Sequence, residues 1–203
     1  MNDVLRGIAV VAVALGGGLA RPLPAQWGLT LDVQRNAFGG TSKDTTSSGP
    51  GGSFRPGNTP ALTLRVDRRL GRVALGVGVR YSRSAVVLNA RDLYIGLRGE
   101  FTTLETVPEI RVRLARTSHG AALHCYGGPV IGVWTFEDFG ARVVTGAVVG
   151  VAGEIPIFDR LAFSLRVGGG LTHSIFRDGE LPPELVIGTT SRSEIALGLR
   201  YGH

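Results

Sequence analysis

Side chains able to do chemistry are few in this chain, and their spacing does not form a known site. One cysteine, Cys125, and four histidines are present. The histidines are His119, His124, His173 and His203. No H-x-x-x-H, H-E-x-x-H or Cys/His spacing occurs among them, so the sequence predicts no metal site. Without a paired histidine, Cys125 is better explained as a small apolar side chain than as a nucleophile.

The strongest catalytic candidate is the tripeptide Thr172-His173-Ser174, which puts a general base beside a nucleophile. Neighbouring residues of a regular strand point to opposite faces, so His173 and Ser174 would lie out of hydrogen-bond reach of each other. The run Gly168-Gly169-Gly170 lacks the helix and the Lys-Ser/Thr pair of a phosphate-binding loop. We therefore predict no catalytic residues and no cofactor.

The composition is that of a folded, glycine-rich chain. Hydrophobic residues make up 43% of the 203 residues, which excludes a disordered chain. Glycine supplies 31 residues, about twice the usual share of roughly 7%. The formal net charge is +6, but the basic residues are spread along the chain, so we expect no nucleic-acid partner. A single cysteine excludes a disulfide framework.

Residues 1–26 are predicted to be a secretory signal peptide. Arg6 gives a basic start, and an apolar run of 14 residues follows from Gly7 to Ala20. This run is shorter than the roughly 20 residues of a membrane-spanning helix. A helix-breaking stretch then leads to a cleavage site after Ala25 or Gln26, with Ala20 as an alternative. We expect residues 27–203 to form one exported domain.

From Trp27 onward, apolar and polar residues alternate with a period of two, which predicts strands. The pattern is clean in residues 27–34, 62–67, 73–82, 109–114, 161–172 and 194–201, and less regular in 121–136 and 142–155. We therefore expect eight strands. Most of them reach the 9–11 residues that a tilted transmembrane strand needs.

The predicted connections alternate between short and long. Short turns are expected at residues 69–71, 117–120 and 156–159, and long loops at 39–58, 89–103 and 177–190, with 137–141 as the one exception. Short turns at one end and long loops at the other are typical of outer-membrane barrels. Residues 84–104 leave three alternatives, namely an extension of neighbouring strands, a hairpin within a loop, or two further strands of a ten-stranded barrel.

Alternation alone fits both a soluble barrel or sandwich with an apolar core and a membrane barrel with an apolar exterior. Three features favour the membrane barrel. The polar face is rich in glycine and alanine, and its positive and negative charges nearly balance. The apolar faces of the clean strands carry no charged residue. A single arginine on such a face at the bilayer midplane would cost roughly 2–4 kcal/mol. The predicted lumen ion-pair network comprises Asp32, Arg65, Asp67, Arg80, Glu109, Arg111, Arg113, Glu154, Arg166, Glu194 and Arg200.

Aromatic residues near the predicted strand ends suggest two interfacial girdles. Trp27, Phe163 and Tyr201 would form the girdle on the turn side, and Phe38, Trp134, Phe136 and Phe176 the girdle on the loop side. Ordinary core positions are the alternative for these aromatic residues.

Four features carry a family resemblance, namely the leader, the eight alternating segments, the run Tyr126-Gly127-Gly128-Pro129-Val130-Ile131-Gly132 and the final strand Gly198-Leu199-Arg200-Tyr201. In these features the chain resembles the small outer-membrane β-barrel family of the OmpA/OmpX type. The resemblance implies an all-β, eight-stranded antiparallel up-and-down transmembrane β-barrel in the bacterial outer membrane. It also implies contacts with outer-membrane lipid and with the barrel-insertion machinery. Family barrels usually end on an aromatic residue, whereas Gly202 and His203 follow Tyr201 here.

Members of this family serve as structural anchors, adhesins, small pores or lipid-modifying enzymes, so the resemblance leaves the activity open. The charged side chains should fill an eight-stranded lumen. We therefore expect a closed, non-enzymatic and monomeric barrel that meets extracellular partners through loops 39–58 and 177–190. The alternatives are a small pore, a lipid A deacylase-like enzyme that uses His173, and a soluble exported barrel.

Overall fold

The computed structural model describes residues 27–40, 42–44, 53–90, 93–136, 140–174 and 185–202. The predicted signal peptide, residues 1–26, lies outside them. Eight long strands occur in the described ranges: β1 (Trp27–Gly39), β4 (Thr59–Leu70), β5 (Val73–Ala90), β6 (Leu93–Arg116), β7 (Ala122–Phe136), β8 (Gly140–Phe158), β9 (Leu161–Thr172) and β11 (Thr190–Tyr201). Three short strands accompany them: β2 (Ser42–Asp44), β3 (Ser53–Pro56) and β10 (Leu185–Ile187).

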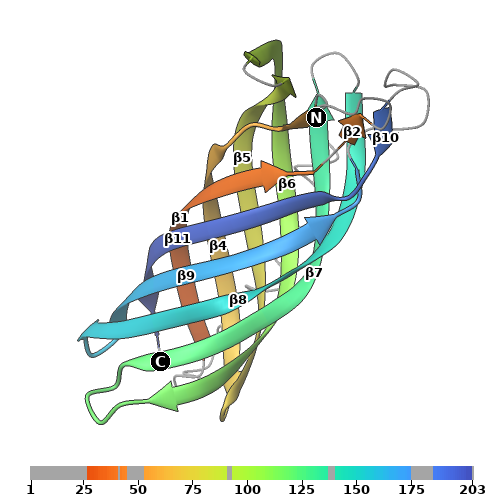
Figure 1. The fold of residues 1–203 in the computed structure, drawn as a ribbon. Coiled ribbons are helices and arrows are strands. Elements are labelled where there is room, and N and C mark those ends of the chain that lie inside the picture. The colour runs from red at the N-terminus through yellow and green to blue at the C-terminus, as the bar shows by residue number, and fades with distance from the viewer. Residues whose placement is uncertain are drawn as a thin grey trace.

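The eight long strands close into an antiparallel barrel, as the sequence predicts. Each pairs with the next long strand along the chain, and β1 pairs with both β4 and β11, which closes the ring. Figure 1 shows these long strands tilted around a common axis. Because the ring is closed, each of the eight long strands pairs with a neighbouring strand on both sides. This pairing removes the usual route to edge-to-edge aggregation.

Residues 84–104 extend two barrel strands, which answers the question that the sequence leaves open. The β5–β6 ladder continues to the pair Ala90 and Leu93, with one register shift between Ala85 and Val87. The predicted long loop at 89–103 is therefore wrong, because most of these residues belong to β6. The ten-stranded alternative is wrong for the same reason.

The barrel has a short-turn end and a long-loop end. Residues 71–72, 117–121 and 159–160 connect β4 to β5, β6 to β7 and β8 to β9. Gly71 has a φ of 69°, which suits the tight turn that it begins. At the other end, β2 pairs with β10, so one short strand from each of the two predicted interaction loops, 39–58 and 177–190, contributes to a small two-stranded sheet.

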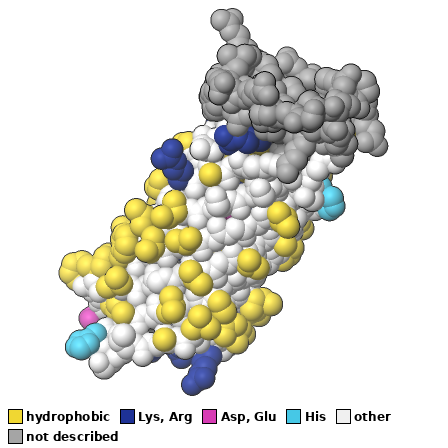
Figure 2. Space-filling view, in the orientation of Figure 1, with side chains coloured by type: hydrophobic (Ala, Val, Ile, Leu, Met, Phe, Trp, Pro, Cys, Tyr) yellow, Lys and Arg dark blue, Asp and Glu magenta, His cyan; other side chains and the backbone are white. Residues whose placement is uncertain are grey.

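The apolar face of the barrel points outward and the charged face points inward. Leu75, Val77 and Leu197 are 47%, 37% and 50% exposed, whereas Arg80 and Arg200 are each 2% exposed. Figure 2 shows hydrophobic side chains over the visible wall and Lys or Arg side chains towards its two ends. This arrangement confirms the predicted inside-out assignment. No helix in the described ranges is long and apolar enough to cross a membrane.

Candidate functional site

Among the described residues, equal numbers of arginines and carboxylates fill the lumen. Six arginines and six carboxylates are buried: Arg65, Arg80, Arg111, Arg166, Arg192, Arg200, Asp32, Asp67, Glu105, Glu109, Glu154 and Glu194. Strand alternation places them there, because they occupy inward positions on β1, β4, β5, β6, β8, β9 and β11. Burial of so many ions is tolerable only where each finds a partner of opposite charge.

One group of ion pairs crosses the middle and the loop side of the lumen. Arg80 contacts Glu105 at 3.1 Å and Glu194 at 2.9 Å, and Arg192 contacts Glu105 at 2.7 Å. The remaining pairs are Arg65 with Asp32 at 2.5 Å, Arg65 with Glu109 at 3.6 Å, Arg166 with Glu109 at 2.5 Å and Arg192 with Glu194 at 3.7 Å. Four arginines and four carboxylates make this central group electrically neutral.

A second group lies nearer the short turns. Arg200 contacts Asp67 at 2.5 Å, and Arg111 bridges Asp67 at 2.9 Å and Glu154 at 2.6 Å. Arg69 and Arg200 each approach Glu154 to 3.6 Å. Three arginines share two carboxylates here, so this turn-side group carries an excess of positive charge.

Tyr126 joins the central group, and glycines make the space for it. Its hydroxyl donates to Glu194 Oε1 at 3.0 Å, and the Arg166 guanidinium lies 3.7 Å from the centre of its ring. A Cβ atom at Gly150 or Gly168 would collide with this phenol. The small residues predicted on the polar face thus leave room for large side chains from other strands.

Two network members are absent from the sequence prediction, and one predicted member lies apart. Glu105 and Arg192 are both buried. Glu105 lies two residues before inward-facing Val107, and Arg192 lies two residues before inward-facing Glu194, so strand alternation places both inside. Arg113 is only half-buried at the short-turn end. The described part of the chain gives it no salt bridge, so it lies outside both groups.

The predicted loop-side aromatic girdle is wrong for Phe38, Trp134 and Phe136. All three are buried inside the barrel, where they form a cluster with Phe101 and Val144. Trp134 stacks on Phe101 at 5.4 Å between ring centres and donates to Glu105 Oε1 at 3.2 Å. The physical reason is alternation. Phe38 shares the inward parity of Asp32 on β1, and Trp134 and Phe136 follow inward Val130 on β7.

The turn-side aromatic residues do point outward. Trp27, Phe163 and Tyr201 are exposed on the wall near the short turns, together with Phe158, which the sequence analysis does not include. Phe176 lies outside the described residues. These exposed rings have the placement that an interfacial girdle requires.

His173 and Cys125 each contact a residue of a neighbouring strand. His173 follows buried Thr172 and is exposed, and its Nδ1 lies 3.1 Å from Thr145 Oγ1. The Cys125 thiol donates to the Val112 carbonyl at 3.7 Å. In the described ranges no group of three or more His, Cys, Asp or Glu side chains could hold a metal ion.

Solved structures of small outer-membrane proteins share this fold. Neisserial surface protein A is 10% identical, with a TM-score of 0.51 over 88% of this chain and 97% of that one. OprG from Pseudomonas aeruginosa is 11% identical, with a TM-score of 0.52 over 88% and 96%. AlkL, solved in lipid bilayers, is 12% identical, with a TM-score of 0.57 over 91% and 94%.

No protein-family model matches the chain, and no curated protein matches it. At these identities the likeness concerns the fold alone. The fold is that of the small eight-stranded outer-membrane barrels, in agreement with the resemblance stated from the sequence.

Proposed function

We propose, on the basis of this fold, that the chain is an integral protein of the bacterial outer membrane with a closed, non-enzymatic barrel. Residues 1–26 direct export and are removed. The barrel is monomeric and anchors the long loops at the cell surface, where they meet extracellular partners. The single observation that carries this proposal is the neutral central group of ion pairs, buried behind an apolar exterior.

Burial and charge support a sealed lumen rather than a pore. The contacts of Arg80, Glu105 and Arg192 link β5, β6 and β11 through the centre of the barrel. Above them, the buried cluster around Trp134 fills the loop side. An eight-stranded barrel has just enough interior for its own side chains. Water and ions therefore find little continuous space.

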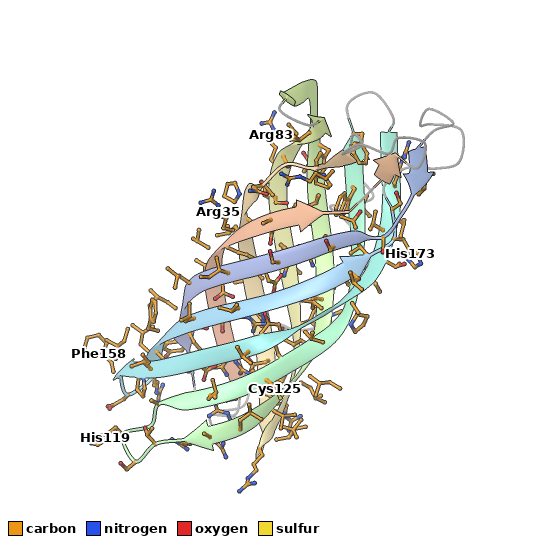
Figure 3. All side chains as sticks on the ribbon, in the orientation of Figure 1. Arg35, Arg83, His119, Cys125, Phe158 and His173 are labelled. Carbon is orange, nitrogen blue, oxygen red and sulfur yellow. The ribbon has the colours of Figure 1, made fainter. Side chains whose placement is uncertain are left out.

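The exterior supports insertion into a lipid bilayer. Exposed Leu, Val and Ile side chains cover the outward faces of all eight long strands, and burial of this surface in hydrocarbon is favourable by about 25 cal/mol per Å². Outward-facing Arg35 and Arg83 lie towards the loop end, away from the middle of the wall (Figure 3). This distribution matches an apolar band flanked by polar ends.

The β2–β10 pairing supports the loops as one surface. It joins described residues of the first and the last long connections next to the β1–β11 seam. Residues on these loops would then act together towards a partner, which a rigid barrel holds outside the membrane.

Fractionation of cells that make the full chain tests the location and the export. We expect the protein in the outer-membrane fraction, with an amino terminus at Gln26 or Trp27. Unheated and boiled detergent gels should show two mobilities, since a folded barrel resists the detergent until it is heated. Release by salt or carbonate without detergent would contradict insertion and favour the soluble barrel.

Planar-bilayer recording of the purified protein tests the closed lumen. We expect no discrete conductance steps under conditions in which a general porin, added afterwards to the same bilayer, conducts. Reproducible steps from the protein would contradict the sealed lumen and establish the pore alternative.

A further inference from the structure

A cavity at the short-turn end of the barrel is not explained by a closed anchor. It has a volume of about 470 Å³ and is lined by the ends of β4, β6 and β8 and by the turns beyond β6 and β8. Its basic and hydroxyl lining comes from Arg69, Arg113, Arg116, Ser118 and His119. We name it the mouth cavity. Figure 3 shows His119 and Phe158, which both line it, at the same end of the barrel.

A β-bulge brings two of these arginines to one cavity. Residues three apart on a regular strand point to opposite faces, so Arg113 and Arg116 would diverge. The β6–β7 register shifts between Arg113 and Ala115, and Leu114 and Ala115 are both exposed. Both arginines then line the mouth cavity. Bulges of this kind re-aim side chains next to functional sites.

The mouth cavity holds positive charge that its own carboxylates leave unbalanced. Glu154 is already shared by Arg111 at 2.6 Å and by Arg69 at 3.6 Å. Asp159 is the other carboxylate of the lining and is exposed in the turn. Within the described chain neither Arg113 nor Arg116 forms a salt bridge. The cavity shares Arg69 and Glu154 with the turn-side group, and the two sets together hold five arginines and three carboxylates.

A buried histidine next to the cavity has hydrogen-bonding capacity to spare. His124 is the cross-strand partner of Arg113, and its side chain is 97% buried. Its Nδ1 has no hydrogen-bond partner among the described residues, and the side chain lies beside the cavity rather than in its lining.

An apolar groove adjoins the mouth cavity. Its volume is about 230 Å³, and it shares Arg116, Ala122 and Glu154 with the cavity. The rest of its lining is mostly apolar and includes outward-facing Leu123 and Ile155. A Cβ atom at Gly153, also in the lining, would meet nothing within 4 Å, so the groove is open there.

We propose that the mouth cavity and the groove together bind one anionic glycerophospholipid, with its phosphate in the cavity and part of an acyl chain in the groove. Paired guanidinium groups match phosphate oxygens in geometry as well as in charge. Ser118 and His119 offer further donors, and the groove removes chain methylenes from water. The inference rests on the proposed membrane insertion, because that insertion puts the short-turn end beside a lipid leaflet.

Calorimetry on the purified barrel in a zwitterionic detergent tests the site. The probes are a short-chain phosphatidylglycerol, the matching phosphatidylcholine and glycerol phosphate. The binding variant is Arg113→Gln with Arg116→Gln. Its control, Arg35→Gln with Arg68→Gln, removes the same charge from exposed residues outside the cavity. Gly153→Leu fills part of the groove and leaves Arg113 and Arg116 in place. Unheated gel mobility shows separately whether each variant is folded.

We expect phosphatidylglycerol to bind more tightly than either other probe. The binding variant should lose at least about tenfold in affinity, which corresponds to about 1.4 kcal/mol. Gly153→Leu should weaken the binding of phosphatidylglycerol but not that of glycerol phosphate. The control should change neither affinity. Equal binding by the folded binding variant and its control would overturn the site. Glycerol phosphate that binds as tightly as the lipid would overturn the lipid assignment. Failure of the native chain to fold in detergent would instead contradict the proposed function.

Discussion

The carboxylate of Glu105 and the guanidinium of Arg192 meet at 2.7 Å, although their strands lie on opposite sides of the barrel. Three long strands separate β6 from β11 in each direction around the ring. This salt bridge therefore crosses the lumen from one side of the barrel to the other. The same carboxylate also holds Arg80 and accepts from Trp134, so it joins the ionic and the aromatic parts of the interior.

Glu105→Gln should destabilise the barrel by about 3–5 kcal/mol, the usual cost of removing one partner from a buried ion pair. It leaves Arg80 and Arg192 with one shared carboxylate, Glu194. Urea unfolding in lipid vesicles measures the change. The matched control is Thr106→Ala, which alters an exposed residue beside it. Equal stability of the two variants would show that the ion pair across the lumen adds nothing.

Gly168→Val should also destabilise the barrel, by about 1–3 kcal/mol, because the lumen has no space for a larger side chain there. The new side chain would collide with the Tyr126 hydroxyl and disturb its bond to Glu194. Gly153→Ala is the control, since a Cβ there meets nothing within 4 Å. The same unfolding assay applies. A stable Gly168→Val barrel would mean that the lumen is less tightly filled than described.

His173→Ala should leave lipid A acylation in cells unchanged. The exposed imidazole contacts Thr145 and points outward, away from the buried carboxylates of the lumen. Mass spectra of lipid A from cells with and without the protein show whether it removes acyl chains. Spectra from cells with the variant show whether that removal depends on His173. Acyl chains removed by the native protein and retained with the variant would establish the enzyme alternative.

The β6–β7 seam should exchange its amide hydrogens faster than other parts of the wall. Its ladder pairs Thr106 with Ile131 and Ile110 with Gly127, with no pair between. Pro108 and Pro129 fall opposite each other in this gap, and proline has no N–H to donate. Hydrogen exchange followed by mass spectrometry should show lower protection in 107–110 and 127–131 than in 146–151, which is paired on both sides. Equal protection would show that the wall is continuous there.

The alternation of apolar and polar residues makes the fold predictable, and extended to the strand ends it also predicts more of the interior. Strand period and turn spacing are local properties, so the eight strands and most lumen ions follow from the sequence. Nearness to the strand ends suggests interfacial positions for Phe38 and Trp134, whereas their parity along the strands places them inside. Glu105 comes directly after residues 84–104, for which the sequence leaves three alternatives. The bulge at Arg113 depends on cross-strand register, which one sequence does not reveal.

Spin labels in lipid vesicles test the central claim, that apolar side chains face lipid while ions fill a sealed interior. Labels would replace Leu75, Val77 and Leu197 on the outward face and Thr63 and Ser82 on the inward face, in a Cys125→Ala background. We predict that the outward labels collide with oxygen, which dissolves in lipid, and that the inward labels are shielded from oxygen and from a water-soluble nickel chelate alike. Outward labels more accessible to the chelate than to oxygen would contradict the account.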